Sequence, residues 1–152
     1  ARRLLRDPRH AADAFTAGLL HDIGALVWAM ACPDELERVL SAAHADPNTR
    51  HTAEESVTGV SHAEVGAYLL GIWGLPCPIV EAVAHHHHPE RVARRDFDVS
   101  AAVHVADRLV HEAMRPTERP LTEAELQALG AQASLETWRG LASDLRRATH
   151  NT

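Results

Sequence analysis

The chain has 152 residues, which is enough for one domain with a sizeable core and too few for a second independent core. Its 15 basic and 21 acidic residues give a formal net charge of −6, which does not favour a broad surface for nucleic acid or anionic membranes. Two cysteines without CxxC spacing indicate neither a disulfide framework nor a thiolate zinc site. No apolar run has the length of a signal peptide or a membrane span. We therefore expect a soluble, cytoplasmic protein that neither binds nucleic acid directly nor crosses a membrane.

Helix signals dominate the chain, since alanine, leucine, glutamate and arginine recur at helical spacing and strand-like alternation is rare. The sequence predicts an all-α fold, a bundle of about seven to nine helices with no sheet. Asp7 and Pro8 begin the first helix, which should end near His21 and Asp22. The residues expected on its core face are Ala11, Ala14, Phe15, Gly18 and Leu19.

Two helices should follow, over residues 24–31 and 33–46. The first is almost wholly apolar and is stopped by Cys32 and Pro33. The second ends at "DPN", residues 46–48. Its apolar stripe consists of Leu36, Val39, Leu40 and Ala43.

A capping box predicts the next helix, because Ser61 at the N-cap is followed three residues later by Glu64. Gly74 should close this helix. Its expected buried face consists of Val65, Tyr68, Leu69 and Ile72. A further helix should run from about Pro78 through the four histidines and stop at His88, since proline disfavours helical geometry in the residue before it.

The remaining third of the chain also predicts helices. Residues 98–114 are the longest stretch with a buried face. Thr122 with Glu125, and then Ser134, are start signals for two more helices. Residues 115–120 are expected to form a loop.

The 12 histidines carry the chemical information, because they cluster with aspartates at the ends or faces of apolar helices. Imidazole and carboxylate groups are common ligands of zinc, manganese and iron. Three alternatives stay open at this point. His21 and Asp22 are also compatible with an ordinary capped helix end, the run 85–88 with a solvated helix end whose charge suits the helix dipole, and all the histidines with a structural role.

The segments "AFTAGLLHDIGALV", "GVSHAEVGAYLLGIWGLP", "IVEAVAHHHHPE" and "AAVHVADRLV" together resemble the HDOD domain, an HD-related output domain of bacterial signalling proteins. This domain belongs to the HD and HD-GYP superfamily of metal-dependent phosphohydrolases. The resemblance extends to the tail "LQALGAQASLETWRGLASDL". It implies that residues 1–152 are a single HDOD-like domain that lacks its N-terminal part.

The resemblance also implies a metal site. Its ligands would be His21, Asp22, His62, His86, His87 and Asp107. The bound metal would be one or two divalent ions of iron, manganese or zinc, with Asp22 able to bridge two of them. Neighbouring residues on a helix point about 100° apart, so we expect His86 and His87 to serve two adjacent ions rather than one. His85 and His88 are extra to the pattern.

Three departures from the family's enzymes bear on activity. Ala25 stands where many HD phosphohydrolases have a phosphate-holding lysine, the GYP motif is missing, and His10 is the only histidine before the HD pair. We therefore expect an output module without cyclic-dinucleotide phosphodiesterase activity. Its partner would be a sensor or receiver domain, in the parent chain or in another protein, and any small ligand would contain phosphate. The alternative is an active metal-dependent phosphohydrolase or phosphodiesterase, in which Asp22 would be catalytic as the bridging ligand.

Overall fold

The computed structural model describes residues 8–43, 50–92, 97–114 and 120–150. Within these ranges the chain is helical and contains no strand, so the predicted fold class is confirmed. The elements in chain order are α1 (Pro8–Leu20), α2 (Ile23–Ala31), α3 (Pro33–Ala42), α4 (Arg50–Thr58), α5 (His62–Ile72), α6 (Cys77–His85), the 3-10 turn η2 (Pro89–Arg91), α7 (Val99–Met114), α8 (Glu123–Ala128) and α9 (Leu135–His150).

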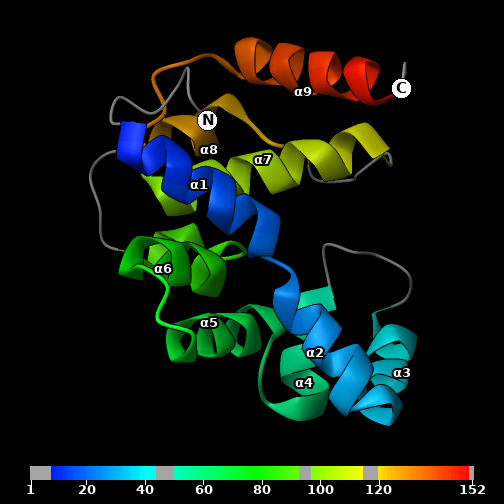
Figure 1. Cartoon of the computed structure of the whole chain (residues 1–152). Coiled ribbons are helices and arrows are strands. Elements are labelled where there is room, and N and C mark those ends of the chain that lie inside the picture. Colours follow the sequence, from blue (N-terminus) through cyan, green and yellow to red (C-terminus); the bar gives the residue numbers. More distant parts are fainter. Residues whose placement is uncertain (1–7, 44–49, 93–96, 115–119, 151–152) are drawn as a thin grey trace.

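The helices are arranged around α7 and α5 (Figure 1). Helices α1 and α6 pack against α7 and against each other, and α9 covers α7 from above in this view. Helix α5 continues the bundle downward by packing on α6 and on α2. Helices α3 and α4 form a hairpin at the lower end, where α3 contacts α2. The N-terminal ends of α2 and α5 therefore meet in the middle of the molecule.

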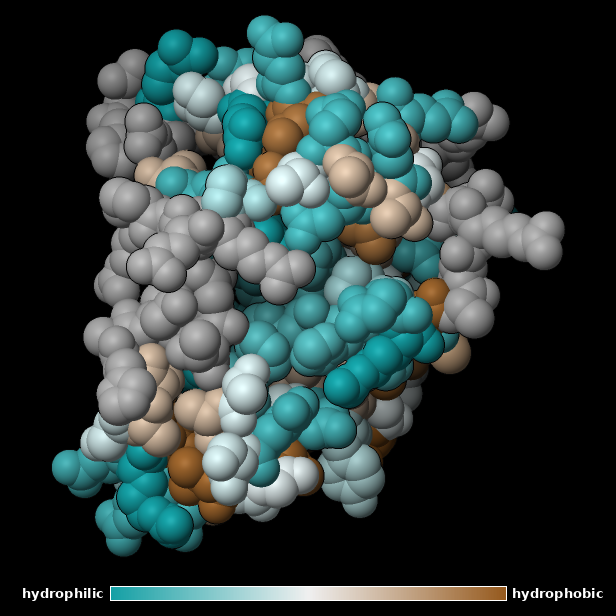
Figure 2. Space-filling model, turned by 180° about the vertical axis from the view of Figure 1, so that it is seen from behind, coloured by the Kyte–Doolittle hydropathy of each residue, from teal (hydrophilic) through white to brown (hydrophobic). Residues whose placement is uncertain are grey.

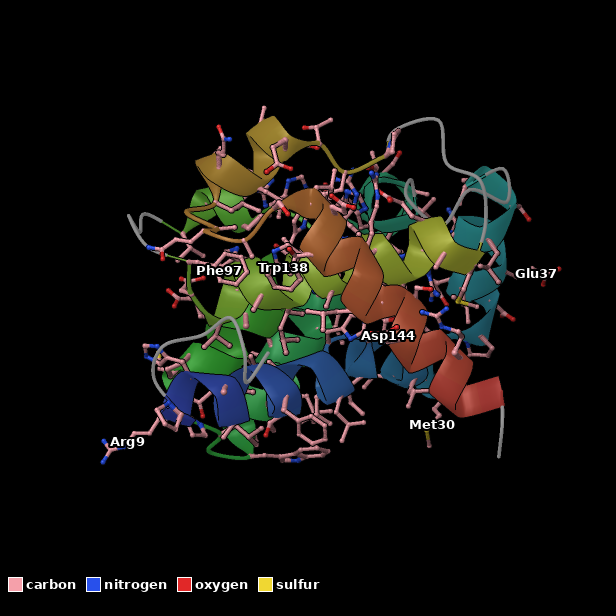
Figure 3. All side chains as sticks on the ribbon, turned by 90° about the horizontal axis from the view of Figure 1, so that it is seen from above. Arg9, Met30, Glu37, Phe97, Trp138 and Asp144 are labelled. Atoms are coloured by element: carbon pink, nitrogen blue, oxygen red, sulfur yellow. The ribbon has the colours of Figure 1, made fainter. Side chains whose placement is uncertain are left out.

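The described core consists of three apolar clusters. The largest lies between α1, α5, α6 and α7 and includes Ala17, Leu70 and Val83. A second lies under α9, where the rings of Phe97 and Trp138 pack at a centroid distance of 5.4 Å (Figure 3). The third belongs to the hairpin of α3 and α4 and consists of Val39, Ala43 and Ala53, with Val57 packed against it. The hairpin thus has a small core of its own.

The largest residues predicted on the core faces of α1 and α5 are exposed, so these parts of the prediction are wrong. Phe15 and Leu19 are 72% and 74% exposed, and Tyr68 and Ile72 are 75% and 65% exposed. Small residues are buried in their place, namely Ala11, Ala14 and Ala17 in α1, and Ala63, Gly66 and Ala67 in α5. Within the third helix, Val39 and Ala43 are buried as expected, whereas Leu40 is exposed. The prediction places bulky side chains inside because burial of apolar area stabilises the fold. In α5 the buried face instead consists of small residues, and this helix approaches α2 closely.

The closest approach is between α2 and α5. A Cβ atom at Gly24 would lie 1.9 Å from the carbonyl oxygen of His62 and 2.7 Å from the backbone nitrogen of Gly66. No side chain fits in that space without moving the backbone. The glycine two residues after Asp22 therefore brings the start of α2 directly onto the start of α5.

Two predicted helix starts are confirmed by their capping interactions, whereas Asp7, the expected N-cap of the first helix, lies outside the described residues. Both capping boxes form, at Ser61 with Glu64 and at Thr122 with Glu125. Gly74 ends α5 with a φ of 75°, in the left-handed region. Helix α6 ends at His85, earlier than the limit at His88, and α4 was not predicted at all. The "DPN" terminator and most of the loop expected at 115–120 lie outside the described residues.

The expectation about membrane-spanning segments also needs a correction. By length and composition alone, the segment Pro8–Ala31 is long and apolar enough to cross a membrane, with a mean hydropathy of 1.4 in its most apolar window. This is weak support for a span, because core helices of soluble proteins pass the same test. In the structure a turn at His21 and Asp22 divides the segment into α1 and α2.

Candidate metal centre

The HD pair occupies the turn between α1 and α2, and its side chains contact other polar groups of the centre rather than capping a helix, although that of Asp22 is 60% exposed. Asp22 is at the N-cap of α2, yet its side chain makes no capping hydrogen bond. Instead Oδ1 lies 3.2 Å from Nε2 of His62, and Oδ2 lies 3.5 Å from Nε2 of His21. The alternative of an ordinary capped helix end is therefore excluded for Asp22.

His62 is the first residue of α5, and both of its ring nitrogens have close neighbours. Nδ1 lies 2.5 Å from Oε2 of Glu54, and that oxygen also accepts the backbone N–H of His62 at 2.7 Å. Nε2 lies 3.1 Å from Nε2 of His87 and 3.4 Å from Nε2 of His86. The ring is buried, with a side-chain exposure of 4%.

His86 and His87 lie just beyond the last residue of α6. His86 is completely buried, its Nδ1 lies 2.8 Å from the carbonyl oxygen of Val83, and its own carbonyl oxygen is 2.6 Å from Nδ1 of His104. A solvated helix end is thus excluded for His86. The rings of His86 and His87 lie 4.0 Å apart at the end of α6, and they belong to one group with His62. The expectation that His86 and His87 serve different ions is therefore wrong in its reasoning, since they can face one ion.

The hydrogen bonds of the outer nitrogens determine what the inner nitrogens can do. Nδ1 of His21 faces the carbonyl oxygen of Gly18 at 2.8 Å, as Nδ1 of His86 faces Val83 and Nδ1 of His62 faces Glu54. These oxygens only accept hydrogen bonds, so each Nδ1 carries a proton. In the neutral rings Nε2 then carries a lone pair and points inward. Neutral imidazoles in this arrangement place lone pairs next to one another, which is unfavourable unless a cation or proton lies between them.

The spacing of these inner atoms suits a metal ion. The separations of Nε2 of His62 from Nε2 of His87, Nε2 of His86 and Oδ1 of Asp22 are 3.1, 3.4 and 3.2 Å. Ligand atoms at the usual zinc distances of about 2.0–2.1 Å in a tetrahedron are about 3.3 Å from one another. His62, His86 and His87 could thus bind a metal ion, and the nitrogen and oxygen donors are those that such ions take in proteins.

A second group lies beside the first and shares a residue with it. His21, Asp22 and His86 offer ligand atoms that all lie within 4.8 Å of one another. Asp107 of α7 is next to this group, with Oδ1 3.5 Å from Nε2 of His21 and 3.2 Å from Nδ1 of His111. All the predicted ligands are therefore brought together, with Asp107 at the margin. Their roles as ligands stay predictions.

The metal-free centre shifts the pKa values of its groups in opposite directions. Burial lowers the pKa of His62, but its hydrogen bonds with Asp22 and Glu54 outweigh this and raise it to about 9. The hydrogen bond with His62 lowers the pKa of Asp22 to about 2. Burial, together with the charges of His62 and His21, lowers the pKa of His86 to about 4, and burial also lowers that of His87. In the metal-free protein, protonated His62 thus supplies the positive charge that a metal ion would otherwise provide.

The extra histidines of the run differ from the predicted pair. His88 pairs with Glu90 at 3.1 Å, whereas Nδ1 of His85 is buried without a hydrogen-bond partner. Both line a pocket of about 50 Å³ beside His87, together with His51 and Arg91. The ring of His51 stacks on that of His87 at 4.3 Å. Figure 2, which views the molecule from behind, shows hydrophilic side chains gathered across the middle of that face.

Sequence reasoning missed Glu54 and His51, the two residues of α4 that reach the centre. Both lie in α4, a helix that was not predicted and that precedes His62 in the chain. The signal that was available is the pair Arg50 and Glu54 at helical spacing, with Ala53 and Val57 as an apolar pair. The polar character of "RHTAEESVT" hid that signal.

Comparison with known proteins identifies the family of this all-helical, histidine-rich chain. The family model of the HDOD domain matches residues 1–89, which is more than half of the chain. The chain therefore belongs to the HDOD domain family. The match includes five of the six predicted ligands, while Asp107 and the tail from 126 to 145 lie beyond it, so the resemblance of that tail stays a prediction.

One relative matches a stretch of this chain about as long as the one that the family model matches. An uncharacterized protein of Treponema pallidum (strain Nichols) is 36% identical over 78 residues, which are 51% of this chain and 15% of that protein. The chain thus corresponds to a small part of this relative. No solved structure matches the chain.

Proposed function

We propose that this HDOD domain is a signal-transduction output module that holds a divalent metal ion between His62, His86, His87 and Asp22. The observation that carries the proposal is the orientation of the rings. The Nδ1 atoms of His62 and His86 are tied to oxygen acceptors, so the lone pairs of their Nε2 atoms converge with Oδ1 of Asp22.

Iron, manganese and zinc are the ions that this set of nitrogen and oxygen donors favours. A bound ion would supply Lewis-acid chemistry, or a strong contact for a phosphate-containing ligand. His62 and His86 would hold it through Nε2, and their outer hydrogen bonds would keep the rings from turning.

A regulatory role is favoured over catalysis by what surrounds the centre. Ala25 is in the first turn of α2, where a phosphate-holding lysine is found in many related enzymes, and it offers no charge. We propose that the module works in the cytoplasm of a bacterium, downstream of a sensor or receiver domain. The exposed apolar side chains of α1 and α5 offer contacts for such a partner.

Elemental analysis tests the metal proposal directly. Protein purified without a polyhistidine tag should contain iron, manganese or zinc, and removal of the metal should lower its melting temperature. Asp22→Ala should lose the metal, whereas Asp34→Ala, which removes an exposed carboxylate from α3, should keep it. Metal-free protein whose melting is unchanged by added ions would contradict the proposal.

A phosphohydrolase is the second candidate, and one observation favours it. The two carboxylate oxygens of Asp22 face different histidines, His62 and His21, as expected of a ligand that bridges two ions. A screen of the metal-loaded protein against phosphomonoesters and phosphodiesters tests this candidate. Turnover that Asp22→Ala abolishes and Asp34→Ala leaves intact would establish the enzyme.

A further inference from the structure

Glu54 is a buried carboxylate that the family motif does not include. Its side chain is 1% exposed, although it lies in a short polar helix. Oε2 accepts the backbone N–H of His62 at 2.7 Å and lies 2.5 Å from Nδ1 of the same residue. Oε1 accepts from Nε of Arg50 at 3.0 Å. Both oxygens thus have partners, and the described partners of Oε2 both belong to His62.

A buried carboxylate is costly, so its position calls for a physical reason. Removing a charge from water costs several kcal/mol unless partners compensate for it, and an apolar residue usually stabilises such a position more cheaply. Arg50 and the two N–H groups of His62 compensate for Glu54. The capping of α5 alone would need only one of these bonds, to the backbone N–H. The second bond, to the ring, acts on the orientation of His62.

That second bond determines which nitrogen of His62 faces the centre. With Nδ1–H donated to Glu54, Nε2 is the nitrogen that can give up its proton and bind a metal ion, and it is the atom that lies near His86, His87 and Asp22. A carboxylate acceptor also makes the opposite nitrogen a stronger donor to a metal ion than an amide or carbonyl acceptor would. His86 and His21, by comparison, donate to backbone carbonyl oxygens.

We propose that Glu54 is a positioning residue of the metal centre, which holds His62 in the Nδ1–H tautomer and strengthens its Nε2 as a ligand. The proposal rests on the proposed function, that the centre binds a divalent metal ion. It also makes the hairpin of α3 and α4 a part of the centre. That hairpin has its own apolar core, and Glu54 is the residue through which it reaches His62.

The test compares Glu54→Gln, Glu54→Ala and the matched control Glu55→Gln. Glutamine keeps the size and an acceptor oxygen but loses the charge, whereas Glu55 is the next residue of the same helix and makes no described bond to His62. Zinc affinity, measured by competition with a chromophoric chelator, should fall about 10- to 100-fold for Glu54→Gln and further for Glu54→Ala. Glu55→Gln should remain within about twofold of the unchanged protein, since it leaves the orientation of His62 intact.

A spectroscopic readout separates positioning from mere support of the fold. In the zinc-loaded protein, the Nδ1 proton of His62 should give a sharp, slowly exchanging resonance in nitrogen-correlated NMR spectra. In Glu54→Gln this resonance should shift and exchange faster, while the circular dichroism of the helices stays the same. Cobalt-loaded protein should show a changed absorption band in the same variant.

The outcomes of the two proposals are distinguishable. If the unchanged protein binds neither zinc nor cobalt, the metal centre itself is refuted. If it binds zinc and folded Glu54→Gln binds it equally well, with an unchanged Nδ1 resonance, the metal centre stands and the role of Glu54 is overturned. Loss of affinity in Glu54→Gln with normal binding by Glu55→Gln supports it.

Discussion

The two sides of the centre differ in how their charged and polar groups are paired. On one side, which we call the imidazole side, the rings of His62, His86 and His87 meet at Nε2 separations of 3.1 and 3.4 Å. On the other, the carboxylate side, Asp107 lies between His21 and His111 at 3.5 and 3.2 Å. The carboxylate side already pairs opposite charges, because hydrogen bonds with His21 and His111 outweigh burial and lower the pKa of Asp107. The imidazole side places similar groups together and gains most from a cation.

This difference teaches that proximity of ligand-type residues is not enough to define a metal site. A carboxylate between two imidazoles is satisfied by protons alone, and it raises the pKa of His21 and of His111. On the imidazole side, the Nδ1 atoms of His62 and His86 already donate to oxygen acceptors, and three Nε2 atoms that face one another cannot all be satisfied by protons. We therefore expect the first ion to bind on the imidazole side.

The largest expected effect comes from removing one ligand on each side. His86→Gln should weaken zinc binding by at least about 100-fold, equal to about 2.8 kcal/mol, because a buried ring and its inward lone pair are lost. His21→Gln should weaken it by no more than about tenfold, or about 1.4 kcal/mol. Competition titrations of both variants at the same pH measure the difference. Equal losses would remove the distinction between the two sides.

The next effect concerns the close contact between α2 and α5 at Gly24. Gly24→Ala should lower the free energy of unfolding by about 1–3 kcal/mol, because the new Cβ atom meets the backbone of His62 at 1.9 Å. Gly71→Ala, in α5, is the control, since no atom lies within 4 Å of its added Cβ. It should be neutral or stabilise the helix by up to about 1 kcal/mol. Urea denaturation of both variants provides the measurement, and equal stability of the two would show that α2 and α5 can separate without cost.

The third effect is the pH dependence of the stability of the metal-free protein. The pKa of His62 is about 9 when folded against 6.5 in its ordinary state, so its contribution to stability is complete below pH 6.5 and is lost as the pH rises through 9. The pKa of His86 is about 4, so its contribution is complete above pH 6.5 and is lost as the pH falls through 4. Stability should therefore be greatest near pH 6.5.

Each arm of that profile should have a slope of at most about 1.4 kcal/mol per pH unit for one proton. Urea denaturation in the presence of a chelator, from pH 4.5 to 8.5, measures it. His62→Gln should flatten the alkaline arm and His86→Gln the acid arm. A wild-type profile without a maximum in this range would contradict the assigned environments of both rings.

The sequence by itself determined the features that depend on local chemistry. The capping boxes at Ser61 and Thr122, and the glycine stop at Gly74, are hydrogen-bond and backbone rules that act within a few residues. The family could be recognised for a similar reason, since the motif "HD" and the run of histidines keep their order along the chain, whereas the ligand roles stay predictions. The predicted ligands all lie at the centre that the helices form.

The tertiary structure alone decided which faces are buried and which nitrogens meet. Tyr68 and Ile72 are exposed because α5 packs through glycine and alanine, a close contact that helical periodicity cannot reveal. His86 and His87, at the C-terminal end of α6, can face one ion together with His62 of α5. Glu54 contacts His62 from α4, a helix that was not predicted because its sequence is largely polar. Each depends on contacts between elements, whose energies do not follow from the residues of either element alone.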